Sequence, residues 1–381
     1  MNLETLKEND FLKDILAQPG SLRSALWQLD FSPLEPLAWA LHKGEIDGVV
    51  LTGMGASYYA LYTAWLHLAA AGYPAIWADC AELVHHTPAL VGPKSLLIVA
   101  SQSGRSAEIV ALMGLISGQA AAGLPPAGLS AITNDLGSPW AEAARRMAAT
   151  GGKQILPLSG VILPLHTEPE LAVSTRTYVN TLAVAQLAAL ALGTYAPHGG
   201  GKLLPHFSDL EGTIDGMEAY LSTWGEKLGL IGEAIGVPGA APLILVGRGL
   251  SFSSAGEGAL NIEESAKLPA IGLQAAEFRH GPLEIVGPGL TGLVFAGERS
   301  VRDLNYRLWR ELRQKGMNAL WVESQWDGEI AGGSLPMPTA AGIGLPLAEI
   351  VPVQLLCVHL CLELGLTPGQ FRYIEKVTSE L

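Results

Sequence analysis

The chain has 381 residues, of which 49% are hydrophobic, and its formal net charge at pH 7 is −13. This length is enough for two domains of ordinary size with a large apolar core. The strong negative charge argues against nucleic acid or an anionic membrane surface as a partner. A phosphorylated ligand would therefore have to be bound by a local group of donors in an otherwise acidic protein.

Three features bear on the compartment. The N-terminal residues are polar, unlike a signal peptide. The apolar segment from Leu182 to Leu192 has about half the length that a bilayer requires, and no other apolar run is expected to reach it. The three cysteines (Cys80, Cys357 and Cys361) give no disulfide framework, and a buried apolar pair at 357 and 361 is favoured over a metal site. We expect a soluble cytoplasmic protein with no membrane partner, metal or cofactor.

Strands and helices alternate through the first half of the chain. A helix is expected to follow the first strand as far as about Ala71, and a long apolar helix from about Val173 to Leu192 closes the unit. Strands are expected near residues 49–51, 75–77, 96–100 and 130–133. This alternation is typical of a parallel sheet covered by helices on both faces.

The second half repeats the rhythm after a glycine-rich linker at 197–202. A helix is expected over 207–235 and another over 347–364, with strands near 243–246, 292–295 and 319–322. The sequence therefore predicts an α/β protein with two doubly wound, flavodoxin-like parallel-sheet domains in tandem, as in an internal duplication. The expected divisions are an N-terminal helical segment at 1–29, domains at 30–195 and 203–365, and a tail at 366–381.

The most informative motif follows the strand at 96–100. It reads Ser101-Gln102-Ser103-Gly104-Arg105-Ser106, and a helical pattern comes after it. Such a turn aims free backbone N–H groups at one point, where the helix dipole favours an anion. The serines add hydroxyl donors, and the glycine lets the backbone approach a ligand closely. We call residues 101–106 the cradle, and we expect it to bind phosphate; a plain helix-capping turn is the alternative.

The corresponding turns of the second half differ in chemistry. Residues 247–251 follow a strand and parallel the first glycine turn, but the strand at 293–295 leads to Glu298, where the first half has serines. A carboxylate would repel an anion, so we expect one phosphate site in each chain.

Three further stretches carry groups that could move protons. Glu257, Asn261 and Glu264 recur at helical spacing and share one helix face, although a hydrated surface would give the same pattern. His280 lies between an arginine and a Gly-Pro turn, where an imidazole can transfer a proton but is more often inert. Lys376 lies in the tail, where a lysine is normally solvated surface.

Taken together, these motifs occur in a known order. The chain resembles the tandem sugar isomerase (SIS) domains of glutamine–fructose-6-phosphate aminotransferase and of stand-alone sugar-phosphate isomerases, deaminases and deglycases. The resemblance covers nearly the whole chain beyond about residue 30. It rests on the segments 53–57, 101–106, 257–260 and 277–282 and on the tail lysine.

The resemblance implies a role for each candidate residue. Glu264 would carry a proton between C1 and C2 of the open-chain sugar, and Lys376 would form a Schiff base with the ketose carbonyl. His280 would open the ring, reaching the site of the neighbouring subunit in a homodimer. The residues implied to hold the phosphate of the sugar are Ser57, Ser101, Gln102, Ser103 and Ser106. Val173, Ser174 and Thr175 would line the sugar pocket, with a one-residue deletion after Glu170, and Glu257 is a further substrate-binding candidate.

Two departures from the family pattern affect the expected reaction. No glutaminase domain is present in this sequence, so glutamine is not expected to donate nitrogen. Asn261 stands where the synthase has a lysine. We therefore expect a glucosamine-6-phosphate deaminase that forms fructose 6-phosphate and ammonia. A fructosamine-phosphate deglycase and a non-catalytic sugar-phosphate sensor are the alternatives, although a sensor would need only the cradle.

Overall fold

The computed structural model describes residues 3–149, 159–170, 172–196, 198, 203–235, 241–324, 333–373 and 375–378. They form two compact units, and neither is one continuous stretch of chain. The cradle unit comprises Ser24–Glu168, Thr177–Pro205 and Ile374–Leu381. The carboxylate unit comprises Met1–Arg23, Pro169–Arg176 and His206–Tyr373. Three short segments thus belong to a different unit from their neighbours in sequence.

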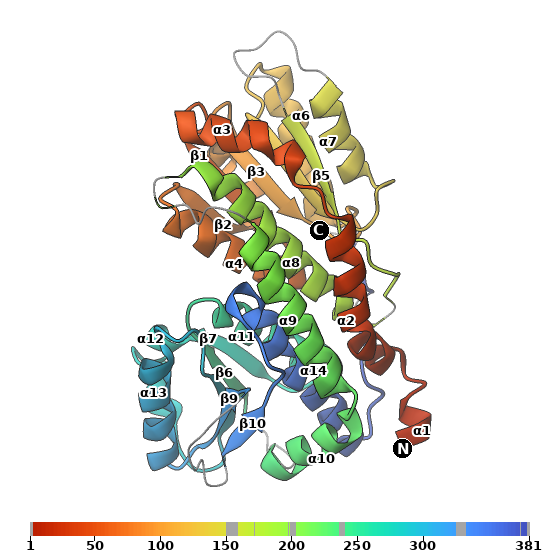
Figure 1. The fold of residues 1–381 in the computed structure, drawn as a ribbon, viewed down its shortest axis with the longest axis vertical. Helices are drawn as coiled ribbons and strands as arrows, with labels where there is room; N and C mark the ends of the chain where they lie inside the picture. The colour runs from red at the N-terminus through yellow and green to blue at the C-terminus, as the bar shows by residue number, and fades with distance from the viewer. Residues whose placement is uncertain are drawn as a thin grey trace. The chain divides into compact units, whose positions relative to one another are not determined.

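The sheet of the cradle unit is entirely parallel, with the strand order β2-β1-β3-β4-β5 (Figure 1, orange to yellow-green). Its strands are β1 (Gly48–Gly53), β2 (Ala75–Asp79), β3 (Ser95–Ala100), β4 (Gly128–Thr133) and β5 (Ser159–Pro164). The order reverses between β1 and β3, and ligands of open parallel sheets bind beyond the carboxyl ends of the strands at such a point. The turn after β3 is the cradle, and the turn after β1 leads to Ser57.

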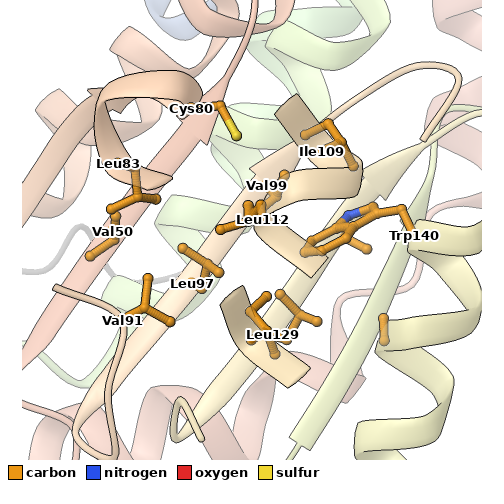
Figure 2. Packing of buried hydrophobic residues seen from close by; sticks show 13 residues of the cluster. Val50, Cys80, Leu83, Val91, Leu97, Val99, Ile109, Leu112, Leu129 and Trp140 are labelled. Carbon is orange, nitrogen blue, oxygen red and sulfur yellow. The ribbon is translucent and has the colours of Figure 1, made fainter. Parts of the chain in front are cut away.

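Helices cover this sheet and bury its apolar strands. They are α3 (Glu35–Lys43), α4 (Ala56–Ala70), α5 (Cys80–His85), α6 (Ala107–Ala121), α7 (Pro139–Ala149) and α8 (Arg176–Leu192). Figure 2 shows strand residues such as Leu97 and Leu129 packed with Leu112 of α6 and Trp140 of α7, all fully buried. The same cluster holds Cys80, whose thiol has a pKa raised to about 12 by burial, so it packs as a small apolar side chain.

The carboxylate unit repeats the same topology, with the order β10-β9-β8-β6-β7 (Figure 1, teal to blue). Its strands are β6 (Leu243–Gly247), β7 (Ala270–Gln274), β8 (Thr291–Phe295), β9 (Asn318–Glu323) and β10 (Ser334–Pro336). The helices that belong wholly or mainly to this unit are α1 (Leu3–Leu6), α2 (Asp10–Gln28), α9 (Leu204–Leu221), α10 (Trp224–Ile235), α11 (Ser251–Ala266), α12 (Ala275–Phe278), α13 (Arg302–Gln314) and α14 (Leu345–Glu363). The shared strand order confirms the predicted duplication.

Several predicted bounds differ from the structure. The helix expected over 207–235 is two helices, because Thr223 accepts hydrogen bonds from the N–H groups of Glu226 and Lys227 and so begins α10. Val173 precedes α8 instead of beginning it. The strands β5, β7 and β10 are not foreseen in the sequence analysis. The predicted linker lies outside the described residues except for His198.

The prediction that no apolar segment is long enough to span a membrane is wrong. Arg176–Tyr195 and Gly342–Glu363 are both long and apolar enough, by length and composition, to cross a membrane. However, 83% of each apolar window is buried within the protein, which is typical of helices that form a core.

The carboxyl group of Glu349 on α14 is buried completely beneath the start of α11. It accepts hydrogen bonds from Ser251 Oγ at 2.7 Å and from Ser254 Oγ at 3.0 Å. Burial raises its pKa to about 8, and the two hydroxyl donors lower it by less. Glu349 is therefore largely an uncharged acid at neutral pH.

We predict that Glu349→Gln stabilises the protein increasingly as the pH rises. The unfolded chain loses this proton near the ordinary pKa, whereas the folded chain keeps it until about pH 8. The protonated carboxyl group therefore contributes its full share to the free energy of unfolding at low pH. As the pH rises toward about 8, the wild type loses this contribution, by at most about 1.4 kcal/mol per pH unit. Urea unfolding at pH 5 and pH 8 measures the effect, and an unchanged difference between variant and wild type would contradict it.

Candidate functional site

A tight turn forms the cradle directly after β3. Ser101 Oγ accepts a hydrogen bond from the N–H of Gly104 at 3.1 Å. Gly104 has φ +59°, and a Cβ on it would lie 2.4 Å from Ser138 Oγ. Both the backbone conformation and the lack of space therefore require glycine here.

The cradle hydroxyls keep donor capacity that no group in the described part of the chain uses. Ser106 is the N-cap residue of α6 but makes no side-chain capping hydrogen bond. Ser103 Oγ only accepts, from the N–H of Arg105 at 3.2 Å, so its own hydrogen remains able to donate. Gln102, Ser103 and Ser106 are half-buried, as is Ser57 in the first turn of α4. The capping alternative is thus disfavoured for Ser106.

The charge of the cradle is close to neutral. The guanidinium of Arg105 pairs with Asp135, with Nη2 at 2.8 Å and Nε at 3.1 Å from the same carboxylate oxygen. The side chain of Arg105 is half exposed, so solvent screens this pair. An anion here would be bound by backbone N–H groups and neutral hydroxyls, as the sequence predicts.

The C-terminal tail contacts the cradle unit at the start of α6. The carbonyl oxygen of Thr378 accepts a hydrogen bond at 3.0 Å from the N–H of Ala107, the first residue of that helix. Lys376, two residues earlier in the tail, is half-buried. The structure thus brings the segment of the predicted lysine to the end of the cradle.

The predicted polar face of α11 is not a hydrated surface. Glu257 and Asn261 are 0% exposed, and Glu264 is half-buried. Asn261 Nδ2 donates to Glu257 Oε1 at 2.8 Å and to the carbonyl oxygen of Ser174 at 3.4 Å. Burial, and then the charge of Glu264, raises the pKa of Glu257 well above its ordinary value.

The segment 169–176, which contains the predicted sugar-binding residues Val173 and Ser174, is held by two carboxylates. Glu170 Oε1 accepts from both the backbone N–H and the hydroxyl of Thr175, each at 2.8 Å. Arg176 pairs with Asp14 of α2 at 2.5 Å, with little exposure of either side chain. Val173 is buried and Ser174 is half-buried. These contacts fix the segment against α2 and α11 within the carboxylate unit.

His280 lies on an exposed turn, as predicted. Phe278, fully buried, anchors this turn, and the N–H of His280 donates to the carbonyl oxygen of Glu277 at 2.8 Å. Arg279 pairs with Glu311 at 2.6 Å. The described contacts of His280 are those of its own turn, so its predicted role in a neighbouring subunit stays a prediction.

Lys267, which is not among the residues predicted from the sequence, is the C-cap residue of α11 and has the left-handed conformation with φ +60°. Its ammonium group donates to the carbonyl oxygen of Glu264 and to that of Gln370, the latter at 2.7 Å. It therefore ties the helix of the candidate base to the beginning of the tail. A lysine immediately after a helical pattern was the signal that could have indicated this contact.

In the second half, Glu298 occupies the position of an anion. Its Oε2 accepts from the N–H of Leu250 at 3.2 Å, at the start of α11. A Cβ on Gly249, which has φ +59°, would lie 2.3 Å from the same oxygen. Glu298 itself lies in the turn after β8, which corresponds to the cradle, and its carboxylate fills the neighbouring turn after β6, where it would also repel an anion.

We predict that Glu298→Ala creates a second anion site, because it frees the N–H of Leu250 and removes a negative charge at the start of α11. Glu298→Gln is the matched control, since it removes the charge but still fills the turn. Calorimetric titration with inorganic phosphate should find one more site in the alanine variant than in the wild type or the glutamine variant. Equal numbers in all three proteins would contradict this assignment.

Comparison with known proteins identifies the architecture. Residues 240–364 match the SIS domain family. The chain is 27% identical over 379 residues to glutamine–fructose-6-phosphate aminotransferase (isomerizing) from Pyrococcus horikoshii, and the match covers 97% of this chain. It covers 57% of that enzyme, so the chain spans little more than half the length of this relative.

Solved structures agree on the fold. The C-terminal domain of glucosamine-fructose-6-phosphate aminotransferase from Francisella tularensis has a TM-score of 0.79 at 19% identity, over 95% of this chain and 98% of that domain. Glucosamine-6-phosphate deaminase from Thermotoga maritima has a TM-score of 0.65 at 17% identity, over 97% and 99% of the two chains. The chain therefore carries a SIS domain in its second half, and its two sheets have the architecture of tandem SIS domains. The resemblance that the motifs indicated is confirmed.

Proposed function

We propose that this protein is a phosphosugar isomerase of the SIS family, and that its reaction converts glucosamine 6-phosphate and water into fructose 6-phosphate and ammonia. The observation that carries the proposal is the cradle, whose neutral donors lie at the point where the strand order of the first sheet reverses. The relatives named for sugar phosphates and for deamination support this choice.

In the proposed mechanism the phosphate is bound far from the reacting carbons. Ser57, the cradle serines and Gln102 would orient the sugar through its phosphate without touching C1 or C2. His280 would open the ring by proton transfer, as an imidazole can near neutral pH. Lys376, or a water molecule, would engage the carbonyl group.

Glu264 would then move one proton. It takes the proton from C2 of the open-chain amino aldehyde and returns it to C1. The C1=O double bond is lost as O1 gains a proton and the nitrogen releases one, which leaves a hydroxyl group at C1 and a C=N bond at C2. Water adds to C2, the C–N bond breaks, and ammonia leaves with the ketose phosphate as the second product. The half-buried position of Glu264 is compatible with a base that contacts a substrate.

We expect the purified protein to release ammonia from glucosamine 6-phosphate in equal amount to fructose 6-phosphate. Glu264→Gln should lower kcat about 100-fold or more, because the amide cannot accept the proton. Ser103→Ala should mainly raise KM, since it removes a contact made equally in the ground and transition states. Coupled assays for both products measure these effects.

Two other outcomes would replace the proposal. Faster turnover of a phosphorylated fructosyl-amine than of glucosamine 6-phosphate would indicate a deglycase. Binding of fructose 6-phosphate without conversion of either substrate, and equal binding by Glu264→Gln, would indicate a sensor. Absence of both ammonia and fructose 6-phosphate would refute the deaminase assignment.

We further propose that the protein acts as a homodimer in which His280 serves the site of the partner subunit. Glu264→Gln and His280→Asn would each be inactive alone. When the two variants are mixed and their subunits exchange, random pairing should restore about a quarter of wild-type activity, because half of the sites in mixed dimers regain both residues. No recovery despite subunit exchange would exclude this arrangement.

A further inference from the structure

Glu257 and Asn261 lie on consecutive turns of α11, and both are 0% exposed. The amide Nδ2 of Asn261 donates to Glu257 Oε1 at 2.8 Å. The remaining oxygens, Glu257 Oε2 and Asn261 Oδ1, are buried and have no hydrogen-bond partner among the residues that the structure describes. Two unpaired acceptors side by side in the interior are costly, because neither can bond to water.

One added proton would give both of these oxygen atoms a hydrogen-bond partner. If Oε2 carries a proton, it can donate to Asn261 Oδ1 while Nδ2 continues to donate to Oε1. The carboxylic acid and the amide then form a ring closed by two hydrogen bonds. The second hydrogen of Nδ2 remains directed at the carbonyl oxygen of Ser174, at 3.4 Å.

Two carboxylates oppose a negative charge on Glu257: Glu264 on the same helix and Glu170 in the segment 169–176. Cys357 of α14 is a further neighbour, but burial raises the pKa of its thiol well above the ordinary value, so it carries no charge. In the part of the chain that the structure describes, no cation is among the groups that shift its pKa, and only the Asn261 amide favours the ionised form. An unpaired carboxylate would therefore be buried among other carboxylates.

We propose that Glu257 is an uncharged carboxylic acid in the working protein and is a positioning residue. Its pairing with Asn261 holds the amide that supports Ser174, and so it fixes the segment 169–176 against the helix of Glu264. It does not bind substrate by charge and takes no part in proton transfer. The catalytic consequence rests on the proposed role of Glu264, whereas the protonation state does not.

Glutamine is the matched replacement, because its amide can form the same two-bonded ring with Asn261. We expect kcat for glucosamine 6-phosphate to be at least about tenfold lower in Glu257→Ala than in Glu257→Gln, because only the glutamine variant keeps the ring. If the alanine variant does not fold, Glu257→Met takes its place. A glutamine variant as impaired as the alanine variant, or unable to fold, would overturn the proposal.

Stability provides a readout that needs no activity. A protonated Glu257 makes the folded protein hold a proton that the unfolded chain releases above its ordinary pKa. The folding equilibrium of wild type should then fall relative to Glu257→Gln as the pH rises from 5 to 8, by up to tenfold per pH unit.

Urea unfolding of both proteins, in a Glu349→Gln background that removes another carboxyl group with a raised pKa, measures this change. If the ratio of the two folding equilibrium constants, wild type to Glu257→Gln, stays constant across the pH range, Glu257 is ionised and the proposal is overturned, whatever the substrate proves to be. If no sugar phosphate is converted while the ratio changes as expected, the proposed reaction fails and the uncharged state of Glu257 stands.

Discussion

Backbone N–H groups at the start of a helix need an acceptor, and the two halves of this protein meet that need in different ways. Each half has a parallel sheet of the same strand order, and each has a glycine turn that leads into a helix near the strand reversal. In the carboxylate unit the acceptor is Glu298, which belongs to the chain itself. In the cradle unit no carboxylate side chain takes this place among the described residues, and hydroxyl groups surround the turn instead. The difference favours the cradle unit over the carboxylate unit for the proposed binding of an anion.

Much of the fold could be predicted from the sequence. The alternation of apolar runs with helical patterns was sufficient for two parallel sheets, because strands buried on both faces are nearly continuous in hydrophobicity. The cradle could be recognised because its serines, glutamine and glycine follow a strand directly. Glu298 could be recognised as incompatible with an anion, although its contact with Leu250 could not.

Other features depend on contacts between residues distant in sequence, and no local pattern indicates them. The assignment of α2 and the segment 169–176 to the carboxylate unit involves ion pairs such as that of Arg176 with Asp14. The bond of Lys267 to Gln370 crosses more than a hundred residues of sequence. The short strand β10 has three residues and little periodicity, and β7 contains a glycine, so neither gives a clear strand pattern. The burial of Glu257 could not be predicted either, because polar residues recur at the same helical spacing on a buried face and on a solvated face.

The division of the chain has a consequence for its dissection into pieces. Residues 1–23 and 169–176 complete the carboxylate unit, which is built mainly from residues 206–373. Residues 374–381 complete the cradle unit. The backbone therefore passes from one unit to the other five times. A cut near residue 200 would leave the C-terminal fragment without α2, without the Glu170 segment and with a tail that has lost its partner at Ala107. The two halves of the sequence share one topology but are therefore interdependent as folding units, and neither half corresponds to an excisable module.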